Sequence, residues 1–432
     1  MKRFFLLTMT IVMYHIPVQA QFTMDKCQML ARNNYPLIKQ HGLIEKSTDY
    51  SVANALKFYL PQVSFSAQTT YQSDVATFPD RMTTLYEQVG INMRGLKKDQ
   101  YRIALDVNQT IWDGGMARAQ KETSIAEGKV LAQSVETELY TLHERVNMLY
   151  FGVLILVEQL RQNDLLQELL QSNYNIVTAY VKNGVAMQSD LQAIKAEQLT
   201  VSQQRIQIES ATKAYRTMLS VMTGQSIDDM AEFEKPLISI SDNNMTYQPN
   251  NRPELQLFEI QSELFEVQKR FVVVSTMPRL GVFIQGFYGN PGLNLFKDMT
   301  ENKWTWNYIA GLRFQWNFGS LYTKKGSIQK LSLAQQQLNN RRETFLFNND
   351  LQQIQQQQAI EKMRKMMIDD DEIIRLRSSI RLSSEAKYAN GTITVGELLK
   401  DITTESQALL SKSLHELEWL KNIYEMKVIM NN

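Results

Sequence analysis

The chain has 432 residues, of which 44% are hydrophobic and 21% are charged, and its formal net charge is +1 at pH 7. This much apolar material permits extensive burial, whereas the balanced charge gives no basis for nucleic-acid binding. Cys27 is the only cysteine, which excludes an intrachain disulfide. We expect Cys27 to be a buried, small apolar side chain in the first helix.

The first twenty residues have the pattern of a secretory signal peptide. Lys2 and Arg3 precede an apolar run over residues 4–13, and Val18-Gln19-Ala20 has the small-x-small form of a cleavage site. We therefore expect residues 1–20 to be a signal peptide and the mature chain to start near Gln21. No later stretch approaches the ~20 consecutive apolar residues of a membrane helix.

Residues 116–182 predict one very long helix, because apolar residues recur every seven positions in two seams. Such a helix would reach about 100 Å at 1.5 Å per residue, which is too long for a compact globule. Asn183-Gly184 is expected to end it, and a second helix should return through residues 187–222. The first seam is Ile125, Ala132, Leu139, Val146, Val153 and Leu160, and the second is Val135, Leu142, Leu149 and Leu156.

The sequence contains an internal repeat. Pro253 in Asn251-Arg252-Pro253 follows Pro36 in Asn34-Tyr35-Pro36 by 217 positions, and residues 278–282 resemble 61–65 at the same offset. Further on, residues 308–315 resemble 101–108, and Asn390-Gly391 resembles Asn183-Gly184, both at an offset of 207. The first copy therefore has ten extra residues between these landmarks, in the loop 72–100.

Each copy is predicted to contain a helix, a β-hairpin and a long helical hairpin. In the first repeat, residues 21–235, we expect strands at 63–71 and 101–112 and a helical hairpin at 116–224 with its turn at 183–184. In the second repeat, residues 236–432, we expect strands at 280–288 and 306–317 and a helical hairpin at 324–430 with its turn at 390–391.

The predicted strands alternate between apolar and polar side chains, so one face should meet water and the other lipid or protein. Aromatic residues near the strand ends, such as Tyr71, Tyr101, Trp112 and Trp304, fit interfacial girdles. The core of an ordinary β-sandwich is the alternative. The predicted lumen-facing residues are Arg102, Asp106, Asn108, Gln285, Arg313 and Gln315; the predicted lipid-facing residues are Val63, Phe65, Ile103, Leu105, Val107, Leu280, Val282, Ile284, Leu312 and Phe314.

Four strands are too few to close a membrane barrel, which needs ~8. An open edge in lipid would leave backbone groups unpaired, and cyclic assembly of three chains would supply twelve strands. The predicted fold is therefore mainly α with a β-barrel portion: a trimeric twelve-stranded barrel continued by an α-helical barrel.

With these features the chain resembles the TolC-type outer-membrane efflux channels. The resemblance rests on the Asn-x-Pro of both copies, residues 60–63 at the start of the first strand, Trp112-Asp113-Gly114-Gly115 with its counterpart Trp316-Asn317-Phe318-Gly319, and residues 388–399. It implies a homotrimer in the outer membrane of a Gram-negative cell, with a periplasmic helical barrel.

The resemblance also implies partners and a task. Such channels are the exits of tripartite efflux or type I secretion systems and pass drugs, small toxic molecules or secreted polypeptides. The hairpin turns at Asn183, Gly184, Asn390 and Gly391 would dock a periplasmic adaptor. That adaptor is linked to an inner-membrane pump of the resistance-nodulation-division or ABC type.

Family members can close the periplasmic tip with acidic residues after the second turn. Glu397 occupies the first such position, and Asp190 is its equivalent in the first copy. Lys400 takes the place of the second acid, with Asp401 beside it, so the sequence departs from a double acidic ring. The alternative is that these acids are solvated carboxylates that favour the start of a helix.

We find no catalytic constellation, no metal-ligand spacing and no cofactor motif in the sequence, so an enzyme such as a secreted hydrolase is not expected. The alternative from another class is a structural coiled-coil or adhesin-like envelope protein without a channel. Such a protein would purify without detergent, whereas an outer-membrane barrel would not.

Overall fold

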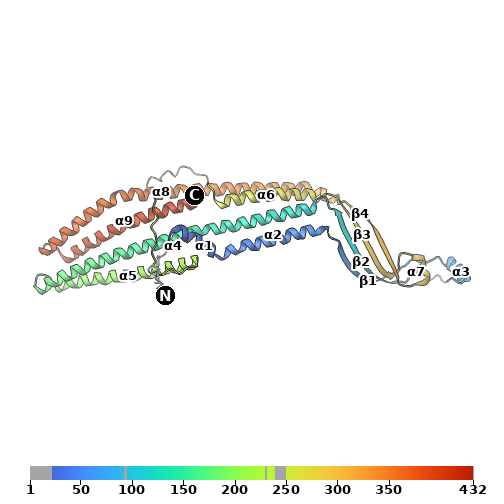
Figure 1. Cartoon of the computed structure of the whole chain (residues 1–432), viewed down its shortest axis with the longest axis horizontal. Coiled ribbons are helices and arrows are strands. Elements are labelled where there is room, and N and C mark those ends of the chain that lie inside the picture. Colours follow the sequence, from blue (N-terminus) through green and yellow to red (C-terminus); the bar gives the residue numbers. More distant parts are fainter. Residues whose placement is uncertain (1–21, 92–94, 229–230, 239–249, 432) are drawn as a thin grey trace, which may run out of the picture. The chain divides into compact units, whose positions relative to one another are not determined.

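The computed structural model describes residues 22–91, 95–228, 231–238 and 250–431, so the expected signal peptide lies outside the described residues. The chain is mainly helical with one sheet (Figure 1), which confirms the predicted mixture. The elements are α1 Met24–Asn34, a 3-10 helix Pro36–Lys39, α2 Gln40–Leu56, a 3-10 helix Lys57–Tyr59, β1 Gln62–Tyr71, α3 Asp80–Gln88, β2 Asp99–Trp112, α4 Met116–Lys182, α5 Gln188–Thr223, α6 Pro253–Val274, β3 Arg279–Asn290, α7 Leu295–Glu301, β4 Thr305–Gln315, α8 Gly319–Ala389 and α9 Val395–Met430.

Both long helices begin at a capping side chain that lies one or two residues after the end of a strand. The Asp113 carboxylate accepts hydrogen bonds from the backbone N–H of Gly115, at 2.8 Å, and of Ala117, at 2.6 Å. In the second repeat, Asn317 accepts from the N–H of Gly319 at 3.0 Å. Because Asn317 caps α8, β4 ends at Gln315 rather than at 317, and α8 begins before the expected residue 324.

The compact units of the molecule do not follow the two sequence repeats. One unit, which we call the helix unit, contains the described parts of residues 1–40, 135–255 and 344–432. The other, the sheet unit, contains the described parts of residues 41–134 and 256–343. Each unit therefore draws on both repeats.

In the helix unit, α1, α5 and α9 lie beside the C-terminal parts of α4 and α8 (Figure 1). Its core includes Tyr150 and Cys27, both completely buried, which confirms the expectation for Cys27. The Tyr150 hydroxyl lies 2.6 Å from the carbonyl oxygens of Phe22 and Glu234. Tyr150 thus joins the start of the described chain to the segment that follows α5.

The heptad seams of α4 are buried in the helix unit, where Leu139, Val146 and Val153 are at most 2% exposed. The seam fails in the sheet unit, because Ile125 is 36% exposed. There, α4 buries small side chains instead, and a Cβ at Gly128 would collide with the Thr48 side chain of α2. Close approach of two helices through small residues replaces the heptad contact.

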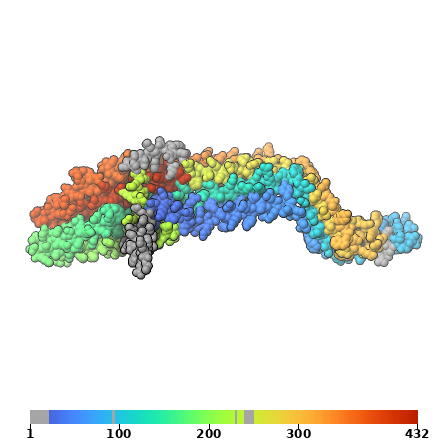
Figure 2. Space-filling view, in the orientation of Figure 1, coloured from blue at the N-terminus to red at the C-terminus, as the bar shows by residue number. Residues whose placement is uncertain are grey.

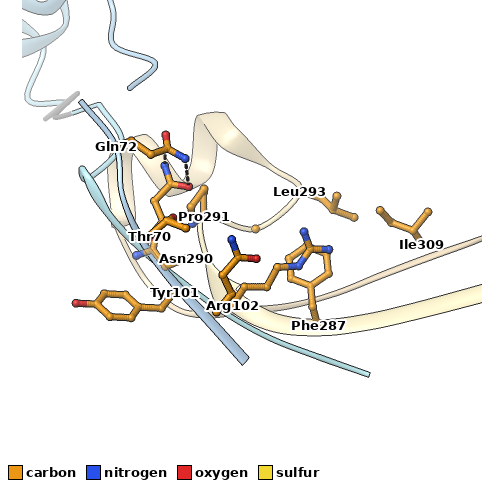
Figure 3. Close-up of a pocket in the computed structure, with 12 residues that line it drawn as sticks. Thr70, Gln72, Tyr101, Arg102, Phe287, Asn290, Pro291, Leu293 and Ile309 are labelled. Carbon is orange, nitrogen blue, oxygen red and sulfur yellow. Dashed lines mark hydrogen bonds between the residues drawn. The ribbon is translucent and has the colours of Figure 1, made fainter. Parts of the chain in front are cut away.

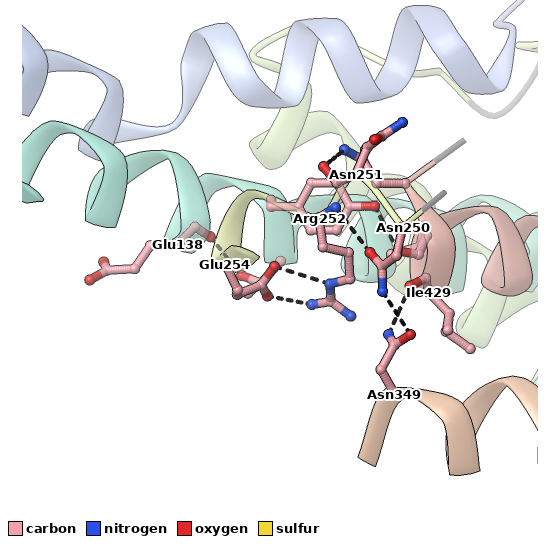
Figure 4. Close-up of polar contacts among 11 residues, drawn as sticks. Glu138, Asn250, Asn251, Arg252, Glu254, Asn349 and Ile429 are labelled. Atoms are coloured by element: carbon pink, nitrogen blue, oxygen red, sulfur yellow. Dashed lines mark hydrogen bonds and ion pairs between the residues drawn. The ribbon is translucent and has the colours of Figure 1, made fainter. Parts of the chain in front are cut away.

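The Asn-x-Pro motifs anchor helix ends within the helix unit. The Asn34 amide donates to the carbonyl oxygens of Val221, at 3.0 Å, and Met222, at 3.2 Å, near the end of α5. In the second repeat, the Asn251 N–H donates to the carbonyl oxygen of Met430, the last residue of α9, at 3.2 Å. Beside it, Arg252 forms an ion pair with Glu254, as Figure 4 shows. Such contacts satisfy groups that a helix terminus leaves unpaired.

Candidate functional site: the sheet faces and the helix turns

The four strands form one antiparallel sheet in the order β1-β2-β3-β4. Its register places Val107 opposite both Val63 and Ile284, so apolar positions align across the strands. All ten side chains predicted to face lipid lie on this one face, because opposite residues share a face. The face is uncovered in the chain: Phe65 and Leu312 are each 72% exposed.

Aromatic side chains border this apolar face at both ends of the sheet. At the loop end, where the connections containing α3 and α7 leave, the Trp304 ring centroid lies 5.7 Å from that of Tyr101 and 5.3 Å from that of Tyr288. At the helix end, where β2 and β4 lead to α4 and α8, the ring centroids of Trp316 and Phe318 are 4.5 Å apart. On β2, Tyr101 and Trp112 are separated by about 36 Å of strand at ~3.3 Å per residue, or about 28 Å after a ~40° tilt. An apolar band of a membrane barrel has this height.

The opposite face carries the residues predicted to line a lumen: Arg102, Asp106, Asn108, Gln285, Arg313 and Gln315. Arg102 Nη2 donates to Gln285 Oε1 at 2.5 Å, and Gln285 donates in turn to Asp106. Arg313 Nη1 donates to Asn108 Oδ1 at 3.4 Å.

Sequence reasoning missed the contacts between two arginines and two phenylalanines on the polar face. The Arg102 guanidinium lies 4.0 Å above the ring centroid of Phe287 (Figure 3), and that of Arg313 lies 4.6 Å above Phe283. The alternation of β3 indicates that both rings lie on the polar face, since Phe283 and Phe287 occupy positions between its lipid-facing residues. Each arginine shields an apolar ring on a face that is otherwise polar.

The two helix turns have the same geometry. Gly184 and Gly391 are left-handed, with φ of 73° and 68°. Gly184 N–H donates to the Val181 carbonyl at 3.1 Å, and Val185 N–H donates to Tyr180 at 2.8 Å. The second turn repeats this pattern 207 residues later: Gly391 N–H donates to the Tyr388 carbonyl at 2.9 Å, and Thr392 N–H donates to the Lys387 carbonyl at 3.0 Å. These are Schellman motifs, which close a helix at a glycine.

The acids predicted near the tip have local partners. Glu397 accepts from the backbone N–H of Thr394 at 2.9 Å, and this hydrogen bond lowers the pKa of the carboxyl. Asp190 accepts from the Met187 N–H at 3.2 Å, so both acids cap the first turn of their helices. Asp401 accepts from the Ser384 hydroxyl at 2.6 Å, while Lys400 is exposed. A constriction formed by these residues stays a prediction.

The two helical hairpins pack against each other, as the green and red segments of Figure 2 show. Their contacts are apolar clusters that draw on α4, α5 and α9: Val177, Ile194 and Val395 form one, and Leu170, Val201, Leu398 and Ile402 form another. The turns are therefore held side by side within the helix unit.

The described residues contain no cluster of three or more His, Cys, Asp or Glu side chains that could hold a metal ion. In the same part of the chain, no helix combines the length and the apolarity needed to cross a bilayer.

Several solved outer-membrane proteins have the same fold. The CmeC outer membrane channel of Campylobacter jejuni is 14% identical, with a TM-score of 0.63 over 94% of this chain and 85% of that one. The Vibrio cholerae outer membrane protein VceC is 13% identical, with a TM-score of 0.61 over 94% of both chains. The Neisseria gonorrhoeae MtrE channel is 12% identical, with a TM-score of 0.62 over 95% of this chain and 89% of that one.

A comparison with curated proteins finds no match. Residues 29–225 match the model of the family described as "Outer membrane efflux protein". This is a family of transport proteins and not an enzyme class, and its location is the outer membrane. The chain is therefore similar to the outer membrane efflux protein family over residues 29–225.

Proposed function

We propose that this protein closes as a homotrimer into an outer-membrane channel, the exit of a tripartite efflux or type I secretion system. The observation that carries the proposal is the bare four-stranded sheet, which has one exposed apolar face and one polar face. In water, so large an apolar surface would promote aggregation; against lipid it is stable.

The sheet edges support the trimer. β1 and β4 each have a neighbour on one side only, so each presents a row of unpaired backbone groups within the described chain. In lipid, unpaired groups cost several kcal/mol each, so the edges require partners. Pairing β1 of one copy with β4 of the next closes twelve strands from three chains.

The helix turns are the proposed docking site for a periplasmic adaptor, which would connect the channel to an inner-membrane pump of the resistance-nodulation-division or ABC type. The first turn supports this with two exposed apolar side chains, Val185 at 67% and Met187 at 73%. The substrates would be small molecules or secreted polypeptides. A coiled-coil envelope protein without a channel would leave the exposed apolar sheet face without a role.

Purification and conductance test the proposal. We expect the protein to require detergent, to have the mass of a trimer by native mass spectrometry and to form ion-conducting pores in planar bilayers. A monomer that is stable without detergent and forms no pores would refute the channel and favour the coiled-coil alternative.

A further inference from the structure

The polar face of the sheet carries an excess of positive charge. Its charged strand residues are Arg102, Arg279, Arg313 and Asp106. Among the described residues, none of the three arginines has an acidic side chain within ion-pair distance, and Asp106 accepts a hydrogen bond from the neutral Gln285. The face therefore presents two net positive charges per chain.

The arginines lie beside two separate hollows in this face. A cavity of about 350 Å³ at the loop end is lined by Arg102, Phe287, Leu293 and Ile309, together with hydroxyl and amide side chains (Figure 3). A second cavity, of about 170 Å³ at the helix end, is lined by Arg279, Arg313 and Phe283, among others. Each hollow thus combines at least one guanidinium with an aromatic ring.

This combination suits one class of solute. A guanidinium offers several N–H donors in a planar fork that matches carboxylate, sulfate or phosphate oxygens. Among the described residues, Arg102 donates one side-chain hydrogen bond, to Gln285, and its other N–H groups can donate to a ligand. The adjacent ring and aliphatic side chains favour an apolar group beside the anion.

We propose that the pore wall of this channel selects amphipathic organic anions and passes them between the two arginine-phenylalanine hollows. The inference rests on the proposed channel, because only a closed barrel turns the polar face into a pore. Both hollows lie on the same face of the sheet. Conduction requires that each binds a solute weakly enough for it to leave. Because the two hollows lie one after the other along the sheet, a solute that leaves one can bind at the next.

Reversal potentials in planar bilayers under a KCl gradient test the charge selection. The wild-type pore should favour chloride over potassium. The neutral double variant Arg102→Gln/Arg313→Gln should lower that permeability ratio by about tenfold at low salt, the scale on which a one-signed cleft concentrates counter-ions. The charge-preserving Arg102→Lys/Arg313→Lys should keep the ratio, and both variants should be checked for trimer formation.

Current block by added solutes tests the amphipathic part. Octanoate should block the wild-type pore at about tenfold lower concentration than acetate, which has no tail, or octylammonium, which has the opposite charge; tenfold corresponds to 1.4 kcal/mol. The neutral double variant should lose this preference.

The failures are distinguishable. Pores whose permeability ratio is unchanged by Arg102→Gln/Arg313→Gln, or that octanoate blocks no better than acetate, would overturn the inference while leaving the channel intact. Wild-type protein that forms no pores would overturn the proposed function itself.

Discussion

Val107→Arg should prevent stable assembly in the membrane. Val107 lies on the apolar face of β2, about midway between the aromatic residues Tyr101 and Trp112, which places it near the centre of the apolar band. An arginine at the bilayer midplane costs about 2–4 kcal/mol. Three copies in a trimer would cost about 6–12 kcal/mol, which is comparable with the whole stability of a typical domain.

Two variants provide matched controls. Leu280→Arg changes a residue on the same face, but at the helix end beside Trp112, where the cost falls to about 0–1 kcal/mol. Asp106→Arg places the same side chain one residue from Val107 on the polar face, where it loses only the Gln285 hydrogen bond. Leu312→Arg, opposite Val282, should resemble Val107→Arg.

The assay is refolding into lipid vesicles, followed by urea titration and by separation of trimer from monomer. The order of destabilisation should be Val107 with Leu312 first, then Leu280, then Asp106. Equal losses in all four variants, or a greater loss for Asp106→Arg, would refute the assignment of the faces.

Three further outcomes are expected. Gly184→Val and Gly391→Val should assemble in the membrane but fail in a dye-efflux assay, because valine disfavours the left-handed φ of both turns; Gly184→Asn, which tolerates that φ, should export normally. Burial opposes ionisation of Glu158, but hydrogen bonds from Arg161 and Gln162 lower its pKa from 4.5 to about 2. The contribution of ionised Glu158 to the unfolding free energy is therefore complete above about pH 4.5 and is lost as the pH falls toward 2. In urea titrations, Glu158→Gln should be destabilising at pH 7 and neutral at pH 2. Burial raises the pKa of Cys27 to about 11, so iodoacetamide should label this thiol only after unfolding, as mass spectrometry would show.

The strands and the turns could be predicted from the sequence because both depend on residues that are close together in the chain. Successive side chains of a strand point to opposite faces of the sheet. The face on which Val107 lies therefore follows from the polar residues Asp106 and Asn108 on either side of it. The pair Asn183-Gly184 reveals the turn because glycine closes a Schellman motif without a Cβ clash.

Contacts between distant segments could not be read in the same way. The placement of Arg102 over Phe287 depends on the register between β2 and β3, whose residues are far apart in sequence. The heptad rule failed at Ile125 because it counts apolar residues and ignores small ones, whereas α4 meets α2 through Gly128. The division into a helix unit and a sheet unit follows from packing between the repeats, which neither repeat specifies alone.

The two edges of the sheet are different strands, β1 and β4, and this has a consequence for the assembly of the proposed trimer. In the proposed trimer, β1 of each copy pairs with β4 of the next, so the copies join head to tail around a three-fold axis. Assembly of such a trimer would depend on the concentration of the chains and would be slow when few copies are present. A copy whose β4 edge is blocked would enter a ring and stop it from closing. In a cell that expresses both forms, such a copy would act as a dominant inhibitor, since one defective chain inactivates two sound ones.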